Sequence, residues 1–235
     1  MRKIMFVARV AQSVLLVVGL STGLATAAAT FPEPPKAEAP LPGKTIVLAG
    51  GCFWGMQGVF EHVKGVTSTQ VGYAGGKKET ARYERVEERD TNHAESIQIT
   101  YDPAVISFGE ILKIYFSVAH DPTTLNRQHN DEGPQYRSAI FYSDEQQKQM
   151  ATAYIKELND AHVFKHAIVT QVVPLPAFYR GEEYHQHYLD QVAACDAHMT
   201  MHCGELNAGY IHGVDFPLLN EFKEKYPEYY TKEIK

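Results

Sequence analysis

The sequence contains few cysteines and has no surplus of positive charge. Only three cysteines, Cys52, Cys195 and Cys203, occur in 235 residues, and an odd number is a poor basis for a structural disulfide framework. It does suit one nucleophile and a pair of partner thiols. The 22 Lys and Arg residues are outnumbered by 28 Asp and Glu residues, and no basic run has the length of a nucleic-acid footprint. We therefore expect no nucleic acid among its partners.

Residues 1–29 have the pattern of a secretory signal peptide. Basic residues at positions 2, 3 and 9 precede an apolar run, which ends in alanine-rich sequence at positions 25–29. An uncleaved membrane anchor is the alternative, because the run from Val10 to Ala29 is long enough to span a bilayer. No cysteine lies at the end of the signal to carry a lipid. We expect a cleaved signal peptide and an exported protein, either periplasmic or secreted.

The composition changes twice more along the chain. Residues 30–43 contain five prolines and are predicted to form an extended linker. Residues 44–190 have an ordinary globular composition with enough material for one core, and we predict that they form the catalytic domain. Residues 191–235 are predicted to be a C-terminal tail that contains a cysteine-bearing insertion. We expect the protein to be a monomer.

Cys52 lies between a predicted strand and a predicted helix. Residues 45–49 form a short apolar run that stops at a pair of glycines, and apolar residues then recur at helical spacing from Phe53 to Val63. Unpaired N–H groups at a helix N-terminus favour an anion, and thiols in such places ionise readily. The alternative is that Cys52 is a small buried hydrophobe. Its position favours a reactive thiolate.

Downstream of Cys52, predicted strands and helices alternate. Strands are predicted over 66–73, 94–101, 138–142 and 167–173, with a surface loop over 77–92. Helices are predicted after a capping box that opens at Ser107, after Ser143, around 182–189, and after Asp215. This order matches an α+β fold, the ferredoxin-like split βαβ plait, in which helices cover one face of a mostly antiparallel sheet.

Glu95 lies on the apolar face of a predicted strand. It shares that face with Ile97, Ile99 and Tyr101, because alternate residues of a strand point the same way. Desolvation favours the protonated form of a buried carboxyl group, so Glu95 could act as a general acid. The alternative is that Glu95, near the start of the strand, points into water.

Several motifs together resemble a known family. They are Gly51-Cys52-Phe53-Trp54-Gly55, Gly72-Tyr73-Ala74-Gly75-Gly76 ahead of Tyr83, His93-Ala94-Glu95, and the loop from Asn126 to Ser138. In this order and spacing they are similar to the peptide methionine sulfoxide reductases of the A type, over about residues 44–189. Two residues depart from the family pattern beside Asp131, since His129 replaces a glycine and Pro134 replaces a threonine.

The resemblance implies thiol-dependent reduction of the S epimer of methionine sulfoxide, free or in peptides and proteins. Cys52 would attack the sulfur and Glu95 would protonate the departing oxygen, which leaves methionine and a cysteine sulfenic acid. Sulfur becomes electrophilic only as its oxygen is protonated. This need explains why the nucleophile would be paired with a carboxylic acid.

The resemblance also assigns the walls of a substrate pocket. Phe53 and Trp54 would enclose the S-methyl group, and Tyr83 and Tyr136 would donate hydrogen bonds to the sulfoxide oxygen. Asp131 would hold the loop or a substrate backbone amide. For the four aromatic residues, ordinary core packing is the alternative.

Cys195 and Cys203 lie in an insertion that the resemblance does not cover. A sulfenic acid is usually reduced by a second thiol, and the resulting disulfide is then reduced by an external dithiol such as a thioredoxin-like protein. The two cysteines are the candidates for this resolving role. A static disulfide is one alternative, and a metal site completed by His198 and His202 is another.

Two other functions fit part of the sequence. A peroxidase or a disulfide exchanger would use Cys52, but exchangers usually place a second cysteine close by, and residues 52–55 lack one. The second is a metal-binding module formed by the tail, in which Cys52 would have no functional role. We favour sulfoxide reduction, with no bound cofactor or metal.

Overall fold

The computed structural model describes residues 31–35, 45–198 and 216–232. Contacts group the chain from Phe31 onward into one compact unit. The predicted signal peptide lies outside the described residues, as do Cys203 and the predicted helix cap Asp215. Within the described ranges, no helix combines the length and apolar character needed to cross a bilayer.

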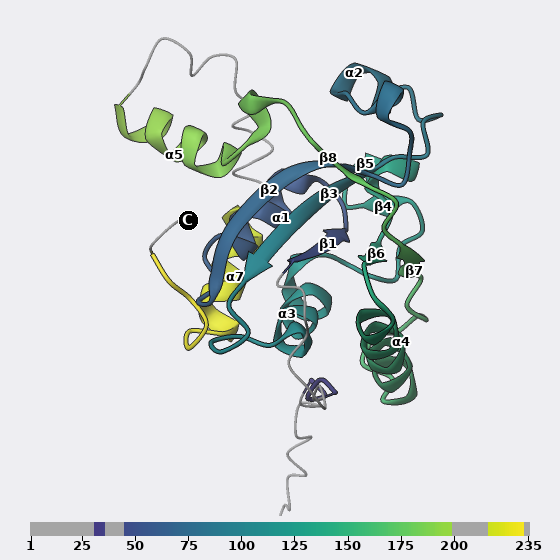
Figure 1. The fold of residues 1–235 in the computed structure, drawn as a ribbon. Helices are drawn as coiled ribbons and strands as arrows, with labels where there is room; N and C mark the ends of the chain where they lie inside the picture. The colour runs from purple at the N-terminus through teal and green to yellow at the C-terminus, as the bar shows by residue number, and fades with distance from the viewer. Residues whose placement is uncertain (1–30, 36–44, 199–215, 233–235) are drawn as a thin grey trace, which may run out of the picture. The chain divides into compact units, whose positions relative to one another are not determined.

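A six-stranded sheet in the order β7-β6-β1-β3-β2-β8 forms the centre of this unit (Figure 1). Its strands are β1 (Thr45–Ala49), β2 (Val66–Ala74), β3 (Ala94–Tyr101), β6 (Ala139–Tyr142), β7 (Gln171–Pro174) and β8 (Phe178–Arg180). Neighbouring strands are antiparallel except for β6 and β7, which are parallel, so the sheet is mixed. The α+β class is confirmed, whereas the finer assignment to a split βαβ plait stays a prediction.

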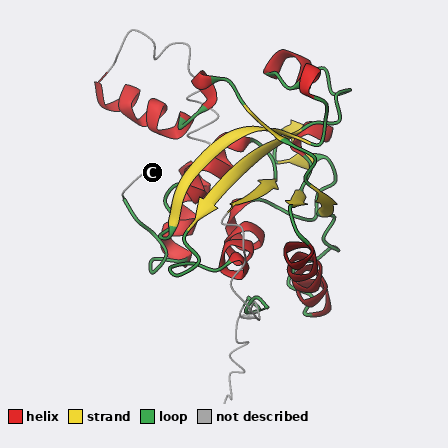
Figure 2. Cartoon of the chain, in the orientation of Figure 1, coloured by secondary structure: helices red, strands yellow, loops and turns green. Residues whose placement is uncertain are grey.

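Helices follow most strands (Figure 2). They are α1 (Phe53–Phe60), α2 (Tyr83–Val86), α3 (Phe108–Ile114), α4 (Glu145–Asp160), α5 (Tyr188–His198) and α7 (Phe216–Lys225). A π-helical turn, Tyr115–Ala119, continues α3, and the short strands β4 (Arg127–Gln128) and β5 (Asp131–Glu132) pair with each other. Single 3-10 turns occupy Lys78–Thr80, Pro134–Tyr136 and Glu183–His185. The predicted surface loop at 77–92 therefore contains two short helical segments.

The predicted capping box of α3 is confirmed. Ser107 accepts a hydrogen bond from the backbone N–H of Glu110, and the Glu110 carboxylate accepts one from the backbone N–H of Ser107. The predicted cap of α4 was wrong by one residue, because the Asp144 side chain accepts from the N–H of Gln147 at 2.8 Å. A carboxylate cap serves the helix start better than a hydroxyl when both stand near it.

The C-terminal third differs most from the sequence-based expectation. The predicted helix around 182–189 is a 3-10 turn followed by α5, and α5 crosses the predicted domain boundary at 190/191. The strand predicted over 167–173 begins only at Gln171, and the three-residue β8 was not predicted. Such short strands are held by pairing with distant partners rather than by local pattern.

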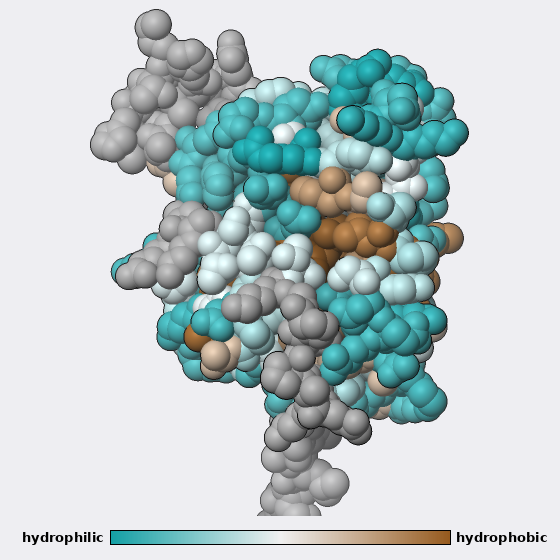
Figure 3. All heavy atoms as spheres, viewed as in Figure 1, coloured by the Kyte–Doolittle hydropathy of each residue, from teal (hydrophilic) through white to brown (hydrophobic). Residues whose placement is uncertain are grey.

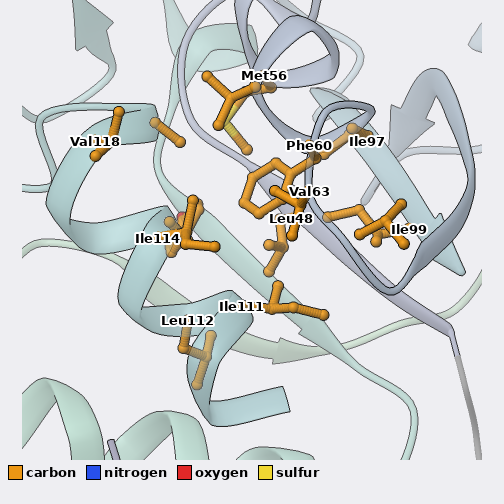
Figure 4. Packing of buried hydrophobic residues seen from close by; sticks show 14 of the residues in the cluster. Leu48, Met56, Phe60, Val63, Ile97, Ile99, Ile111, Leu112, Ile114 and Val118 are labelled. Atoms are coloured by element: carbon orange, nitrogen blue, oxygen red, sulfur yellow. The ribbon is translucent and has the colours of Figure 1, made fainter. Parts of the chain in front are cut away.

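One face of the sheet packs against α1, α3 and α4 to form the main core. Figure 4 shows the central residues of this core, which are Leu48, Met56, Phe60, Val63, Ile97, Ile99, Ile111, Leu112, Ile114 and Val118. In the view of Figure 3, hydrophilic residues surround a smaller apolar area near the centre of the visible face. Because strand residues alternate between faces, the face that buries Ile97 and Ile99 also buries Glu95.

Candidate active site

Cys52 is the N-cap residue of α1, as the sequence predicts. Its backbone carbonyl accepts the first helical hydrogen bond, from Met56 N–H at 3.4 Å, and its side chain does not cap the helix. The side chain is half-buried. A thiol at this end of α1 lies at the positive end of the helix dipole, which favours a thiolate.

Gly51 makes the turn that presents this cysteine. Its φ is +81°, a region that favours glycine, and a Cβ at this position would lie 2.5 Å from Cγ of Gln128. Its N–H donates to the carbonyl oxygen of Tyr136 at 3.2 Å. The turn therefore joins the start of α1 to the loop that carries Tyr136.

Glu95 is buried and faces the same helix end. Its exposed fraction is 3%, which rejects the alternative that it points into water. On β3 it pairs across the ladder with Tyr73 of β2, and its Oε2 accepts a 3.0 Å hydrogen bond from the backbone N–H of Phe53. Because Oε2 accepts the hydrogen of the Phe53 N–H, it cannot point an acidic hydrogen of its own at the same group. In a protonated Glu95, this contact favours Oε1 for the proton, because Oε2 serves as the acceptor.

A cavity of about 100 Å³ brings the predicted site residues together. It is lined by Cys52, Phe53, Trp54, Tyr83, Glu95, Asp131 and Tyr136. Four stretches of chain build it, namely the start of α1, the start of α2, the strand β3, and the segment from β5 through the 3-10 turn. The structure thus places all seven predicted pocket residues at one cavity, while their chemical roles stay predictions.

Two tyrosines, Tyr83 and Tyr136, line this cavity. Burial, together with the nearby carboxylates of Glu87 and Glu95, raises the pKa of Tyr83 to about 12. Burial and the same two carboxylates also raise the pKa of Tyr136 far above its usual value. Both phenols therefore keep their protons at neutral pH. The Tyr136 hydroxyl donates to Oε1 of Glu87 at 3.4 Å, so Glu87, in the predicted surface loop at 77–92, contacts a residue that lines the cavity.

Glu182 is a further residue of the site that the sequence analysis missed. Its Oε1 accepts from the backbone N–H of Tyr83 at 2.9 Å, and its Oε2 accepts from the Tyr73 hydroxyl at 2.8 Å. Burial opposes its ionisation, but these hydrogen bonds outweigh burial and lower the pKa of the carboxyl. The carboxylate therefore fixes the start of α2, from which the Tyr83 ring enters the pocket.

His185, also missed, holds the indole of Trp54. The Trp54 N–H donates to Nδ1 of His185 at 3.2 Å, which leaves the hydrogen of the neutral ring on Nε2, 3.9 Å from Oε2 of Glu182. Burial lowers the pKa of His185 to about 4, so the ring is neutral at physiological pH. The opposite side of the indole stacks on Tyr188, with ring centroids 3.8 Å apart and planes at 5°. Two contacts thus orient the Trp54 indole, namely the hydrogen bond to His185 and the stacking on Tyr188.

No local pattern could have linked Glu182 and His185 to the pocket. The hydrogen bond from Tyr83 to Glu182 spans 99 residues, and the bond from Trp54 to His185 spans 131. Gln186 shows how this segment is held, because its side-chain amide pairs with both the N–H and the carbonyl oxygen of Val71, each at 3.0 Å. Only the clustering of polar and aromatic residues at 182–188 could have indicated a role.

The two candidate resolving cysteines are not placed at the pocket by the structure. Cys195 belongs to α5, where its side chain is outside the described part, and Cys203 lies wholly outside the described residues. Their resolving role therefore stays a prediction.

Comparisons with known proteins agree with this geometry. Residues 44–210 match the family model described as peptide methionine sulfoxide reductase. The chain is 47% identical over 182 residues to peptide methionine sulfoxide reductase MsrA 2 of Synechocystis sp., which covers 77% of this chain and 79% of the relative. It is 44% identical over 198 residues to MsrA 2 of Mesorhizobium japonicum, which covers 83% of this chain and 94% of the relative.

Solved structures with the same fold come from the same family. The crystal structure of Mxr1 from Saccharomyces cerevisiae in reduced form has a TM-score of 0.58 and 35% identity, and covers 63% of this chain and 84% of that chain. Methionine sulfoxide reductase A of Corynebacterium diphtheriae has a TM-score of 0.56 and 36% identity, and covers 64% of this chain and 76% of that chain. The chain therefore belongs to the A-type peptide methionine sulfoxide reductases, a family of oxidoreductases.

Proposed function

We propose that this enzyme reduces the S epimer of methionine sulfoxide, free or within peptides and proteins, to methionine. The observation that carries the proposal is the meeting of Cys52 and the buried Glu95 in one small cavity. A nucleophile and a proton donor on the same cavity are what sulfoxide reduction requires, because sulfur accepts a nucleophile only as its oxygen is protonated.

In the proposed reaction the sulfoxide oxygen passes from the substrate to the enzyme. The Cys52 thiolate attacks the substrate sulfur while Glu95 gives the proton on Oε1 to the oxygen. The attack forms a bond between the Cys52 sulfur and the substrate sulfur. The hydroxyl group then moves from the substrate sulfur to Cys52, which breaks both the sulfur–oxygen bond of the substrate and the new sulfur–sulfur bond, so thiolate, proton and sulfoxide become sulfenic acid and sulfide. The substrate sulfur is reduced by two electrons and the cysteine sulfur is oxidised by two.

The remaining pocket residues would orient the substrate. Tyr83 keeps its hydroxyl proton at neutral pH, which supports its role as a donor to the sulfoxide oxygen. Tyr136 also keeps its proton but donates it to Glu87, so its hydroxyl would turn from Glu87 to the substrate. Phe53 is only 1% exposed, so the half-buried Trp54 offers the larger apolar surface to the S-methyl group. Asp131, half-buried on β5, would accept a hydrogen bond from a substrate backbone amide.

The catalytic cycle needs a reductant for the sulfenic acid. We propose that Cys195 and Cys203 supply the resolving thiols and that an external thioredoxin-like dithiol reduces the resulting disulfide, without a bound cofactor. We also propose that the protein is a monomer, exported with a cleaved signal peptide over residues 1–29, a linker over 30–43 and a tail from 191. Mass spectrometry of the mature N-terminus from cells would test the export and cleavage.

An epimer assay tests the proposed function directly. The purified protein is incubated with each epimer of a methionine sulfoxide ester and an excess of dithiol, beside Cys52→Ser and, as a matched control, the exposed-surface variant Glu88→Gln. We expect reduction of the S epimer by the unmodified protein and by Glu88→Gln, and none by Cys52→Ser. Preference for the R epimer, or activity retained by Cys52→Ser, would refute the proposal.

A further inference from the structure

Three potential metal ligands meet at the end of α1 that is remote from Cys52. Glu61 is the C-cap residue of α1, and His187 and Asp190 lie at the start of α5. One ligand atom from each lies within 4.8 Å of the others. None of the three lines the active-site cavity.

Glu61 is the buried member of this group and its carboxyl group is only half satisfied. The side chain has an exposed fraction of 0%, and its Oε2 contacts Nδ1 of His187 at 2.8 Å. Its Oε1 is also buried and has no hydrogen-bond partner among the described residues. A buried carboxylate oxygen without a partner is costly, so a cation at this position would stabilise the fold.

The surroundings of Glu61 favour a cation further. The C-terminal end of the α1 dipole gives this point a negative potential, and Asp190 adds a second carboxylate. His62 also interacts with both carboxyl groups; its Nδ1 bonds the carbonyl oxygen of Gly58 at 2.8 Å, which leaves Nε2 as the acceptor nitrogen. Glu183, Glu61 and Asp190 are the acidic groups that face His187.

We propose that Glu61, His187 and Asp190 form a binding site for a divalent transition-metal ion, with Zn²⁺ as the fitting probe. One imidazole nitrogen and two carboxylate oxygens are ligands that zinc accepts, whereas calcium and magnesium prefer sites made of oxygen alone. The ion would join the end of α1 to the start of α5, and it takes no part in the proposed reduction.

The test must separate this site from the cysteines. We would therefore measure Zn²⁺ binding by competition with a chelating dye, first on the unmodified protein and then on a full-length variant in which all three cysteines are serine. We expect the cysteine-free protein to bind a single equivalent of Zn²⁺. In that background, Glu61→Gln and His187→Gln should each weaken binding at least about tenfold, as loss of one ligand does.

Two controls make the result specific. The exposed-residue variant His166→Gln should bind Zn²⁺ unchanged, and so should His198→Gln combined with His202→Gln, which removes the histidines of the tail. Cobalt substituted for zinc should give a visible absorption spectrum typical of nitrogen and oxygen ligands, lost in His187→Gln. The proposal is overturned if the cysteine-free protein binds no Zn²⁺, if only the tail variants lose binding, or if Ca²⁺ binds as tightly as Zn²⁺.

Discussion

The backbone N–H of Phe53 and Oε2 of Glu95 are joined by a 3.0 Å hydrogen bond that spans 42 residues of sequence. This bond ties the candidate proton donor to the same helix end that presents Cys52. The side chain of Glu95, which lies on β3, is therefore tied to the element that presents Cys52.

Glu95→Gln should separate the acid function of Glu95 from its structural role. The amide oxygen of glutamine can still accept from Phe53 N–H, so the fold and substrate binding should persist, but no acidic proton is available. We expect kcat to fall by about 100-fold to 10,000-fold with little change in KM, as is typical for loss of a general acid. Steady-state kinetics would measure this, and a variant with kcat near that of the unmodified enzyme would contradict the role.

Glu182→Gln should disturb the site without touching the substrate. Glutamine has one acceptor oxygen where Glu182 uses two, so either Tyr83 N–H or the Tyr73 hydroxyl loses its partner. We expect kcat/KM to fall about tenfold, mostly through KM, because one hydrogen bond to a charged group is worth about 1.5–3 kcal/mol. The neighbouring Glu183→Gln removes an exposed ion pair with Arg180 and serves as the control. Equal effects of the two variants would argue against a positioning role.

Gly51→Ala should damage both stability and activity. Alanine would be strained at φ +81°, and its Cβ would collide with the Gln128 side chain. We expect a loss of about 1–3 kcal/mol in the free energy of unfolding, measured by urea denaturation, with reduced kcat because Cys52 shifts. Gly76→Ala cannot serve as the control, since a Cβ at Gly76 would collide with the His93 side chain. An exposed alanine such as Ala161→Gly gives the reference instead.

The buried His120 should make the protein less stable in acid. Its Nε2 bonds the Ser138 hydroxyl and its Nδ1 bonds the Tyr115 carbonyl, and burial lowers its pKa from 6.5 to about 4. Below pH 6.5 the unfolded chain binds a proton that the folded protein excludes, so stability falls between pH 6.5 and about pH 4. The loss is up to about 3 kcal/mol. His120→Gln should flatten this part of the pH profile, whereas the exposed His166→Gln should leave it unchanged.

Cys195→Ser and Cys203→Ser test the resolving role of the tail. Each variant should reduce one equivalent of sulfoxide in the absence of a recycling dithiol protein, because Cys52 is intact. Multiple turnover with a thioredoxin-like reductant should then be lost, since no disulfide forms for the reductant to attack. Rapid-quench and steady-state assays would distinguish the two phases. Full multiple turnover by the double variant would exclude both cysteines from the cycle.

Local patterns predicted the elements that carry the chemistry. The strand before Cys52, the helix after it and the capping box at Ser107 follow from apolar spacing and backbone hydrogen bonding, which act over a few residues. Strand alternation placed Glu95 on the apolar face but left open that it points into water, and its burial in the structure decides between the two. The identities of the pocket tyrosines needed the family resemblance, because their spacing along the chain is not periodic.

Other parts of the site depend on contacts that the sequence does not display. Glu182 and His185 reach the pocket only because β8 pairs with β2, and three residues are too short a strand to show a pattern. Glu87 reads as a surface residue, yet the loop folds back so that its carboxylate accepts from Tyr136. Tertiary packing decides such positions, and local propensity does not.

The pairing of β8 with β2 also sets an order of assembly. Tyr83 and Trp54 are held by residues that follow them by 99 and 131 positions, so neither is fixed while the chain emerges from the ribosome up to that point. Contacts this distant in sequence close late, because a long loop must first be brought together. During synthesis, Cys52 is therefore present well before the cavity that Tyr83 and Trp54 line can form.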